Sequence, residues 1–460
     1  MEKYEIADSS ALSENSGDNS PIEKTSGDDV ETNAFSPSQT ARLLKKMDLN
    51  LLPFLALLYL LSFLDRSNIG NAKIAGLEKD LKMTGAEDYN TAVAIFFPLY
   101  ILSEVPSNIL MKRLRPSSWL PSIMVACVTT WYKRNECGTR IAVFFSTATL
   151  AGAFGGLLAR GIMEMEGIGG KHGWAWIFIL EGLVTFIVAI AAYFAMHDYP
   201  DTAKFLTQPE RQEVLRRLEE DRSALSDRYD IKFVKDALKD WKVWVNMLAT
   251  AGIYTALYSV SFFMPTIVAN LGYSRESAQL MTVPPYFAAC FVTICCGIMA
   301  DRHGQRGVYM MCSCTVAIIG FVILATVKNH HGVKYFACFL ITTGVYPNIP
   351  QQSAWTGNNL GGTTKRAVGM AMQTSMGNLG GLISGYIFRK RDAPGYVTAH
   401  IVLSCMMGMT LLLSAYMRWW LRKENARRDR EYKSPSEYTP EEMELECDKG
   451  DDATFFRYTF

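Results

Sequence analysis

The chain has 460 residues, and its 46 Lys and Arg residues nearly balance its 45 Asp and Glu residues, for a formal net charge of +1. This balance produces no overall field that would recruit nucleic acid, so we expect no nucleic acid among its partners. The ten cysteines fall mainly inside apolar segments, and neither they nor the six histidines show metal-ligand spacing. The sequence predicts no disulfide framework, no metal and no cofactor, and the absence of any catalytic motif predicts no enzymatic activity.

Residues 1–46 form an acidic, polar segment with almost no large apolar residue before Phe35. Such a segment cannot bury enough apolar surface to fold, so we predict a disordered tail. It does not have the basic start and apolar core of a secretory signal. We therefore expect the first apolar helix to target the chain to a membrane.

Ten apolar runs follow that are long enough to cross a bilayer, because about 20 helical residues span about 30 Å of hydrocarbon. They lie at 48–70, 91–111, 140–162, 174–196, 243–269, 280–300, 307–327, 333–355, 366–388 and 398–421. A further stretch, Trp119–Trp131, is too short to span and is expected to lie at the interface or to re-enter. The sequence thus predicts an all-α, multi-pass membrane protein. Its predicted parts are an N-terminal membrane half at 47–196, a linker at 197–242, a C-terminal membrane half at 243–421 and a tail at 422–460.

Basic residues mark one set of connections between these runs. They are Lys112, Arg113, Arg115, Lys133 and Arg134, the block Lys204–Lys242, Arg302 and Arg306, Lys365 and Arg366, and the block Arg418–Lys433. Because retained positive charge marks the cytoplasmic side, we predict that both termini and the linker are cytoplasmic. The linker mixes charge signs at helical spacing, as expected of a solvated surface helix.

Asp65 and Arg66 are predicted to lie inside the first spanning helix. The apolar stretch Leu49–Leu64 has only 16 residues, about 24 Å of helix, so a spanning helix must continue through both charges. Neighbouring residues do not face each other on a helix, so the two charges cannot simply neutralise one another. We interpret Arg66 as a fork for a substrate carboxylate and Asp65 as a proton carrier. The alternative is a helix that ends at Leu64, with both charges reaching the outer surface.

Two further acidic residues lie within predicted spans. Glu104 is a candidate for proton coupling, or it hydrogen-bonds to a partner helix. Glu181 has the same two interpretations, of which the structural one is preferred.

A polar, proline-containing segment interrupts the predicted span 333–355. Backbone groups freed by proline at membrane depth are tolerated where they line a cavity, so the segment is a candidate wall of a substrate path. The alternative is a kink whose polar groups are satisfied by neighbouring helices. Candidate substrate contacts are Tyr346, Asn348, Gln352 and Trp355, together with Asn378 in the next span.

The turn after the span 280–300 carries a distinctive set of small and charged residues. It contains Gly297, Asp301, Arg302, Gly304 and Arg306, in which glycines permit a tight turn and the charges can latch neighbouring helix ends. This set resembles the gating-loop signature of the major facilitator superfamily. An arbitrary basic turn is the other interpretation.

The resemblance extends along most of the chain. The segments Lys46–Pro53, Leu61–Lys73, Glu104–Asn108, Trp131–Glu136, Lys365–Gly369 and Gly377–Gly381 are similar to the fungal allantoate permease-like branch of the anion:cation symporter family. The resemblance implies two six-helix halves, alternating access, and uptake of small organic anions such as allantoate, nicotinate, other vitamins or sugar acids, usually with protons. Around Val128–Trp131, however, most of helices 3 and 4 of that pattern, about 40 residues, is missing. We therefore expect about ten spans instead of twelve.

The predicted function is proton-driven symport of a small carboxylate. We expect the protein to act as a monomer in the plasma membrane, with the lipid bilayer, the carboxylate and protons as its partners. The alternative is a non-transporting, truncated or defective relative of such a transporter.

Overall fold

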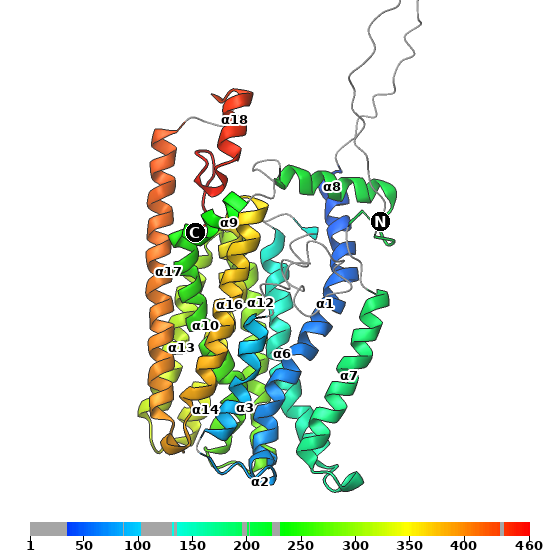
Figure 1. Cartoon of the computed structure of the whole chain (residues 1–460), viewed down its shortest axis with the longest axis vertical. Helices are drawn as coiled ribbons and strands as arrows, with labels where there is room; N and C mark the ends of the chain where they lie inside the picture. Colours follow the sequence, from blue (N-terminus) through cyan, green and yellow to red (C-terminus); the bar gives the residue numbers. More distant parts are fainter. Residues whose placement is uncertain are drawn as a thin grey trace, which may run out of the picture.

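The computed structural model describes residues 35–85, 87–102, 131–132, 136–195, 200–201, 203–222, 231–432 and 437–460. Within these ranges all regular secondary structure is helical, and most helices run side by side in one elongated bundle (Figure 1). Glu104 and nearly all of the short stretch that ends at Trp131 lie outside the described residues. Their predicted roles therefore stay predictions.

The first helix, α1 (Pro37–Ile74), begins earlier than predicted. Ser36 and Gln39 form a capping box, and Pro37 occupies the first helical turn, where its missing N–H costs nothing. Residues 37–46, which the composition assigned to a disordered tail, are therefore helical, and that part of the prediction is wrong. The prediction relied on the low apolar content of this segment. Helix capping does not depend on apolar content, so the capping box can start the helix within a polar segment.

The rest of the N-terminal half is built from the following helices: α2 (Leu77–Asp80), α3 (Asp88–Ala94), α6 (Cys137–Met163), the short 3-10 helix η4 (Ile168–Gly170) and α7 (Gly173–Ala195). After a turn at Ile95 the chain of α3 continues as a helix to Leu102. Both α6 and α7 pack against α1, and α7 also packs against α6. These contacts hold α1 in place, and α1 forms one wall of the cavity described below.

Two linker helices, α8 (Gln208–Arg222) and α9 (Ile231–Lys239), replace the single surface helix expected there. Figure 1 shows α8 lying across the end of the bundle where α1 begins. Lys46 of α1 pairs with Glu210 of α8 at 2.6 Å, and Arg217 of α8 pairs with Glu136 beside α6. The linker is therefore fastened to the N-terminal half by ion pairs.

The C-terminal half contains these helices: α10 (Trp241–Ala269), α11 (Arg275–Met281), α12 (Val283–His303), α13 (Arg306–Thr326), α14 (His331–Val345), α15 (Asn348–Asn359), α16 (Thr363–Ile387), η5 (Lys390–Asp392) and α17 (Val397–Glu431). The predicted span 333–355 is split into α14 and α15, with the break at Tyr346 and Pro347. Proline supplies no backbone N–H and clashes with the preceding turn, which explains a break at this position.

By length and composition, seven of the described helices could cross a membrane. They are the helices at Pro37–Ile74, Cys137–Met163, Gly173–Ala192, Trp241–Ala269, Glu276–His303, Arg306–Thr326 and Val397–Glu431. Helices also occupy the other three predicted spans, although 91–111 is described only to Leu102. The total of ten stays a prediction.

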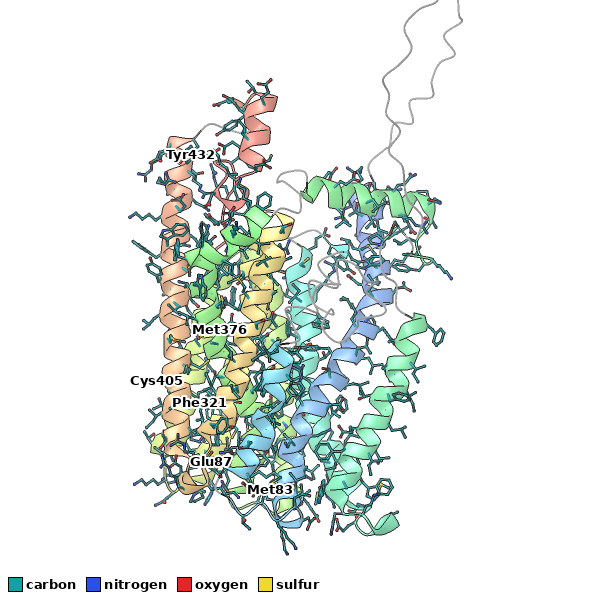
Figure 2. The ribbon with its side chains drawn as sticks, viewed as in Figure 1. Met83, Glu87, Phe321, Met376, Cys405 and Tyr432 are labelled. Carbon is teal, nitrogen blue, oxygen red and sulfur yellow. The ribbon has the colours of Figure 1, made fainter. Side chains whose placement is uncertain are left out.

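The outside of the bundle carries large apolar side chains. Phe194 is 80% exposed and Leu412 is 71% exposed, whereas Phe321 inside the bundle is 1% exposed. Figure 2 shows Cys405 on the outer side of α17, and Phe321 on α13. Extended apolar surface of this kind is unsuited to water but suits contact with lipid.

The C-terminal tail folds back onto the bundle instead of leaving it. It contains α18 (Pro440–Cys447) and η7 (Gly450–Asp452), and Asp451 of η7 is fully buried. Asp451 pairs with Lys242 of α10 and, at 2.6 Å, with Lys365 of α16. The C-terminus, α8 and the start of α1 lie at the same end of the bundle, here named the terminal end (Figure 1).

Candidate functional site

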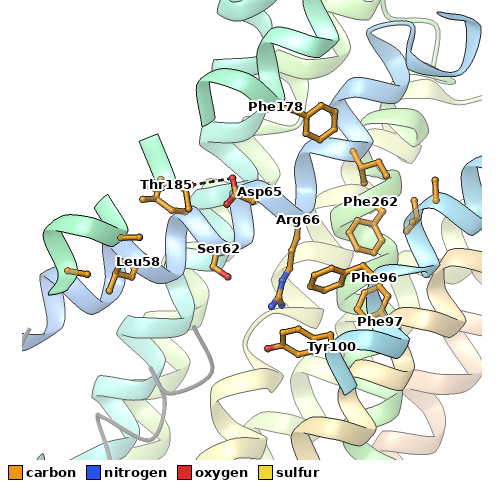
Figure 3. A pocket seen from close by; sticks show the side chains of 16 residues that line it. Leu58, Ser62, Asp65, Arg66, Phe96, Phe97, Tyr100, Phe178, Thr185 and Phe262 are labelled. Carbon is orange, nitrogen blue, oxygen red and sulfur yellow. Dashed lines mark hydrogen bonds between the residues drawn. The ribbon is translucent and has the colours of Figure 1, made fainter. Parts of the chain in front are cut away.

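A cavity of about 600 Å³ lies between α1, α7 and the helical segment that ends at Leu102. Its wall on α1 carries Ser62, Asp65 and Arg66, and the facing wall is aromatic (Figure 3). The aromatic residues are Phe96, Phe97, Tyr100, Phe178 and Phe262. A mostly apolar cavity of this size with a few polar groups is typical of a site for a small molecule.

Arg66 extends into this cavity from α1. Its Nη1 donates a hydrogen bond to the Tyr258 hydroxyl at 3.3 Å, and its guanidinium carbon lies 4.8 Å from the ring centre of Tyr100 and 5.4 Å from that of Phe96. Aromatic faces stabilise a guanidinium without neutralising its charge. Arg66 forms no ion pair with any residue that the structure describes.

Asp65 points away from Arg66 (Figure 3). Its Oδ1 accepts a hydrogen bond from the Thr185 hydroxyl of α7 at 3.4 Å. Because α1 continues to Ile74, the alternative of a helix that ends at Leu64 is wrong. Both charges lie within the bundle, on different sides of one helix.

Tyr258 of α10 connects the two halves through Arg66, although neither Tyr258 nor Asn378 is among the residues that line the cavity. Its hydroxyl accepts the bond from Arg66 and donates one to Oδ1 of Asn378 on α16 at 3.1 Å. Two of the sequence-predicted residues are thus joined through a third that the sequence analysis missed. The available signal was a pair of tyrosines, Tyr254 and Tyr258, spaced one helical turn apart inside a span.

The four candidates on the broken helix lie elsewhere, and none of them lines the cavity. The Tyr346 hydroxyl lies 3.1 Å from that of Ser261, and Asn348 donates to the Gly344 carbonyl at 2.6 Å. Gln352 donates to Asn246 at 2.8 Å, and Trp355 donates to the carbonyl of Thr459 at 2.9 Å. Most of these contacts match the alternative of a kink whose polar groups are satisfied, although Oε1 of Gln352 is buried without a hydrogen-bond partner among the described residues. A role in substrate binding for these residues stays a prediction.

The residues around the turn between α12 and α13, for which the sequence predicts a gating loop, form a compact latch at the terminal end. Asp301 accepts a hydrogen bond from Thr139 of α6 at 2.5 Å and pairs with the buried Arg306. Arg306 also donates to Gln351 of α15 at 3.4 Å. The latch therefore joins α12, α13 and α15 of the C-terminal half to α6 of the N-terminal half.

Glycines shape this latch, while Arg302 is exposed beside it. Gly304 ends α12 with φ +61°, a conformation that other residues rarely adopt. A Cβ on Gly297 would lie 2.3 Å from the Cβ of Ala142 on α6, so only glycine permits this close helix contact.

Comparisons with known proteins agree with this architecture. The family model described as Major Facilitator Superfamily matches residues 117–385. An uncharacterised transporter of Schizosaccharomyces pombe is 32% identical over 446 residues, covering 88% of this chain and 89% of the relative. The MFS-type transporter cnsO of Penicillium expansum is 35% identical over 482 residues, covering 93% of this chain and 92% of the relative.

A solved structure shares the fold. It is a bacterial homologue of the human lysosomal transporter Spinster, in an inward-facing and occupied conformation. The TM-score is 0.54 at 13% sequence identity, and the match covers 83% of this chain and 96% of that chain. At this identity the likeness concerns the fold alone.

Proposed function

The chain belongs to the major facilitator superfamily, and we propose that it is a proton symporter for a small organic anion. It is a multi-pass membrane protein of a transporter family, not an enzyme. The proposed substrate class is that of the allantoate permease-like branch, namely allantoate, nicotinate, another vitamin or a sugar acid. The proposed location is the plasma membrane, with the terminal end in the cytoplasm.

The observation that carries the proposal is Arg66 in its aromatic cavity. The cavity holds a guanidinium without a carboxylate partner among the described residues, flanked by Tyr100 and Phe96. A planar guanidinium can donate two parallel hydrogen bonds to a carboxylate, and the aromatic walls can cover the apolar part of the anion. These features favour a small carboxylate over a neutral sugar or a cation.

Asp65 is the proposed proton carrier beside this site. It is half-buried at the cavity wall, and its described hydrogen bond is with the neutral hydroxyl of Thr185. A carboxyl group at membrane depth without a cation partner is readily protonated and can release the proton when its surroundings change. This arrangement supports coupling of a proton to the anion on Arg66.

The two halves are connected at both the cavity and the terminal end. At the cavity the connection runs from Arg66 through Tyr258 to Asn378, and at the terminal end it runs from Thr139 to Asp301. A substrate that takes hydrogen bonds from Arg66 competes with Tyr258 and changes the contact between the halves. Differential contacts of this kind are what a ligand needs in order to shift a conformational equilibrium.

A rival proposal is that the chain is a non-transporting, truncated relative. The alignment with cnsO extends over 482 positions, whereas this chain has only 460 residues. Some residues of cnsO therefore align with gaps in this chain. This supports an internal deletion, which the sequence motifs put near Val128–Trp131. Loss of two helices would remove packing surface from the N-terminal half and could abolish transport.

Transport assays on the purified full-length chain in lipid vesicles separate the two proposals. Labelled allantoate, nicotinate and gluconate would each be offered with and without an inward proton gradient, with empty vesicles as the control. Symport predicts gradient-dependent accumulation of at least one of these anions that collapses on adding a protonophore. A folded protein that neither exchanges nor accumulates any of the three would contradict symport of this substrate class and favour the non-transporting relative.

A further inference from the structure

Glu181 is a buried carboxyl group on α7 that the proposed mechanism leaves unused. Only 5% of its surface is exposed, and its Oε2 accepts a hydrogen bond from the side-chain amide of Asn68 on α1. Its Oε1 is buried and has no hydrogen-bond partner among the described residues. An ionised carboxylate at membrane depth requires an opposite charge or several donors, so this environment favours the protonated acid.

Glu181 lies one helical turn from the contact that Asp65 makes with α7. Asp65 of α1 accepts a hydrogen bond from Thr185 of α7. Asn68 lies three residues after Asp65 on α1, and it donates a hydrogen bond to Glu181, which lies four residues before Thr185 on α7. The two carboxyl groups are thus about one helical turn apart, roughly 5.4 Å along the helix axes. They interact electrostatically, and like charges at such a distance in a low-dielectric site do not ionise together easily.

No cation on α1 or α6, the two helices that pack against α7, has an ion pair with Glu181 in the described part of the chain, and several of these cations have other partners. Arg66 contacts Tyr258 and aromatic rings, Lys73 pairs with Glu78, Arg140 with Asp48, and Arg160 with Glu164 and Glu276. None of these described groups pairs with Glu181. Asp65 is therefore the titratable partner that faces Glu181 across the α1–α7 interface.

We propose that Glu181 is a second proton-carrying residue of the transport cycle and alternates in protonation with Asp65. In the state in which Asp65 holds the proton, Glu181 is ionised. The proton then leaves the carboxyl group of Asp65, which becomes ionised, and binds Oε1 of Glu181, which returns to the neutral acid that its surroundings favour. The reverse step restores Asp65, and no other reactant is required. This inference rests on the proposed proton symport but assigns a role to a residue outside the cavity lining.

The variant Glu181→Gln tests this role because an amide oxygen can still accept the hydrogen bond from Asn68 but cannot carry the proton. Asn68→Ala is the matched control, since it removes the same contact between α1 and α7 and leaves the carboxyl group. Each protein in lipid vesicles would be assayed with labelled allantoate, nicotinate and gluconate. Two quantities are compared: exchange of labelled for unlabelled anion without a gradient, and accumulation driven by an inward proton gradient at several pH values.

We expect Glu181→Gln to retain exchange and to lose accumulation together with the pH dependence of exchange. Asn68→Ala is expected to keep both, with at most a lower protein yield. Accumulation by Glu181→Gln at the wild-type level would overturn the inference while leaving symport intact. An unmutated protein that exchanges without accumulating would also overturn it, because the two carboxyl groups would then couple no proton.

Two other outcomes have separate meanings. If the unmutated protein exchanges none of the three anions, the proposed function fails and the inference fails with it. If Glu181→Gln alone is missing from the membrane while Asn68→Ala is present, folding depends on the carboxyl group itself. That result would assign Glu181 a structural role and contradict proton transfer.

Discussion

Asp65 and Arg66 are adjacent in the chain, yet their side chains point in different directions from α1 (Figure 3). Asp65 meets Thr185 of α7, and Arg66 meets Tyr258 of α10 at 3.3 Å. Successive residues of a helix are separated by about 100° of rotation, which prevents a direct ion pair between them. This separation is what the proposed function requires, in which Arg66 binds the anion and Asp65 carries the proton.

Arg66→Lys should disable uptake while the protein still reaches the membrane. A lysine ammonium keeps the charge but cannot make a planar, two-pronged contact with a carboxylate. We expect a loss of about 1.5–3 kcal/mol, roughly 10- to 150-fold in apparent affinity, measured as the concentration dependence of vesicle uptake. Normal affinity in Arg66→Lys would contradict the assignment of this residue to the substrate.

Asp65→Asn should separate binding from coupling. The amide resembles the protonated acid and keeps an acceptor for the Thr185 hydroxyl, so exchange should persist while gradient-driven accumulation is lost. The measurement compares the two activities in the same vesicle preparation. Thr185→Val is the matched control, because it removes the hydroxyl and leaves the carboxyl group. Accumulation that survives in Asp65→Asn would rule out this residue as an obligatory proton carrier.

Tyr258→Phe should weaken anion uptake moderately, because it removes the hydroxyl between Arg66 and Asn378 and leaves the ring in place. Loss of one such hydrogen bond costs about 0.5–1.5 kcal/mol, roughly 2- to 10-fold in apparent affinity. Tyr335→Phe is the control, since its hydroxyl bonds the Met281 carbonyl outside the cavity. Equal effects of the two substitutions would show that Tyr258 has no special role at the cavity.

Asp301→Asn should destabilise the latch at the terminal end. The substitution removes the negative charge that pairs with the buried Arg306. Removing one partner of a fully buried ion pair costs about 3–5 kcal/mol of stability. We expect a smaller cost here because Asp301 is partly exposed. Asp429→Asn, in a surface pair with Arg457, should cost less than about 1 kcal/mol. Thermal unfolding of the detergent-solubilised proteins compares the two, and equal melting temperatures would contradict a structural latch.

Asp451→Asn should loosen the C-terminal tail at neutral pH. Burial by itself would raise the pKa of Asp451. The positive charges of Lys242 and Lys365 together lower the pKa by more than burial raises it, so the net shift of the pKa is downward. A carboxyl group whose folded pKa is depressed stabilises the fold above its unfolded pKa, about 3.9, and loses that contribution as pH falls through the lower folded value.

The pH dependence gives the test for this tail. The wild-type protein should release the tail from the bundle only in acid below about pH 4, whereas Asp451→Asn should do so already at pH 7. Protease cleavage of residues 437–460, followed by mass spectrometry, measures this release. Asp448→Asn, on the same tail, serves as the control. Identical cleavage of wild type and Asp451→Asn at pH 7 would show that the ion pairs do not hold the tail.

The sequence by itself determined the helical, membrane-spanning character of this chain, the place of Arg66 inside the first helix, and the tight turn at Gly304. These features depend on the length of apolar runs and on local backbone preferences, which are readable within about 20 residues. Only the tertiary structure decided which polar groups meet. It joined Arg66 to Asn378 through Tyr258, placed Glu181 against Asn68, joined Gln352 to Asn246 away from the cavity, and folded Asp451 back between two lysines. Such pairings depend on the rotation and packing of helices far apart in the chain, and spacing along one helix does not specify the partner on another.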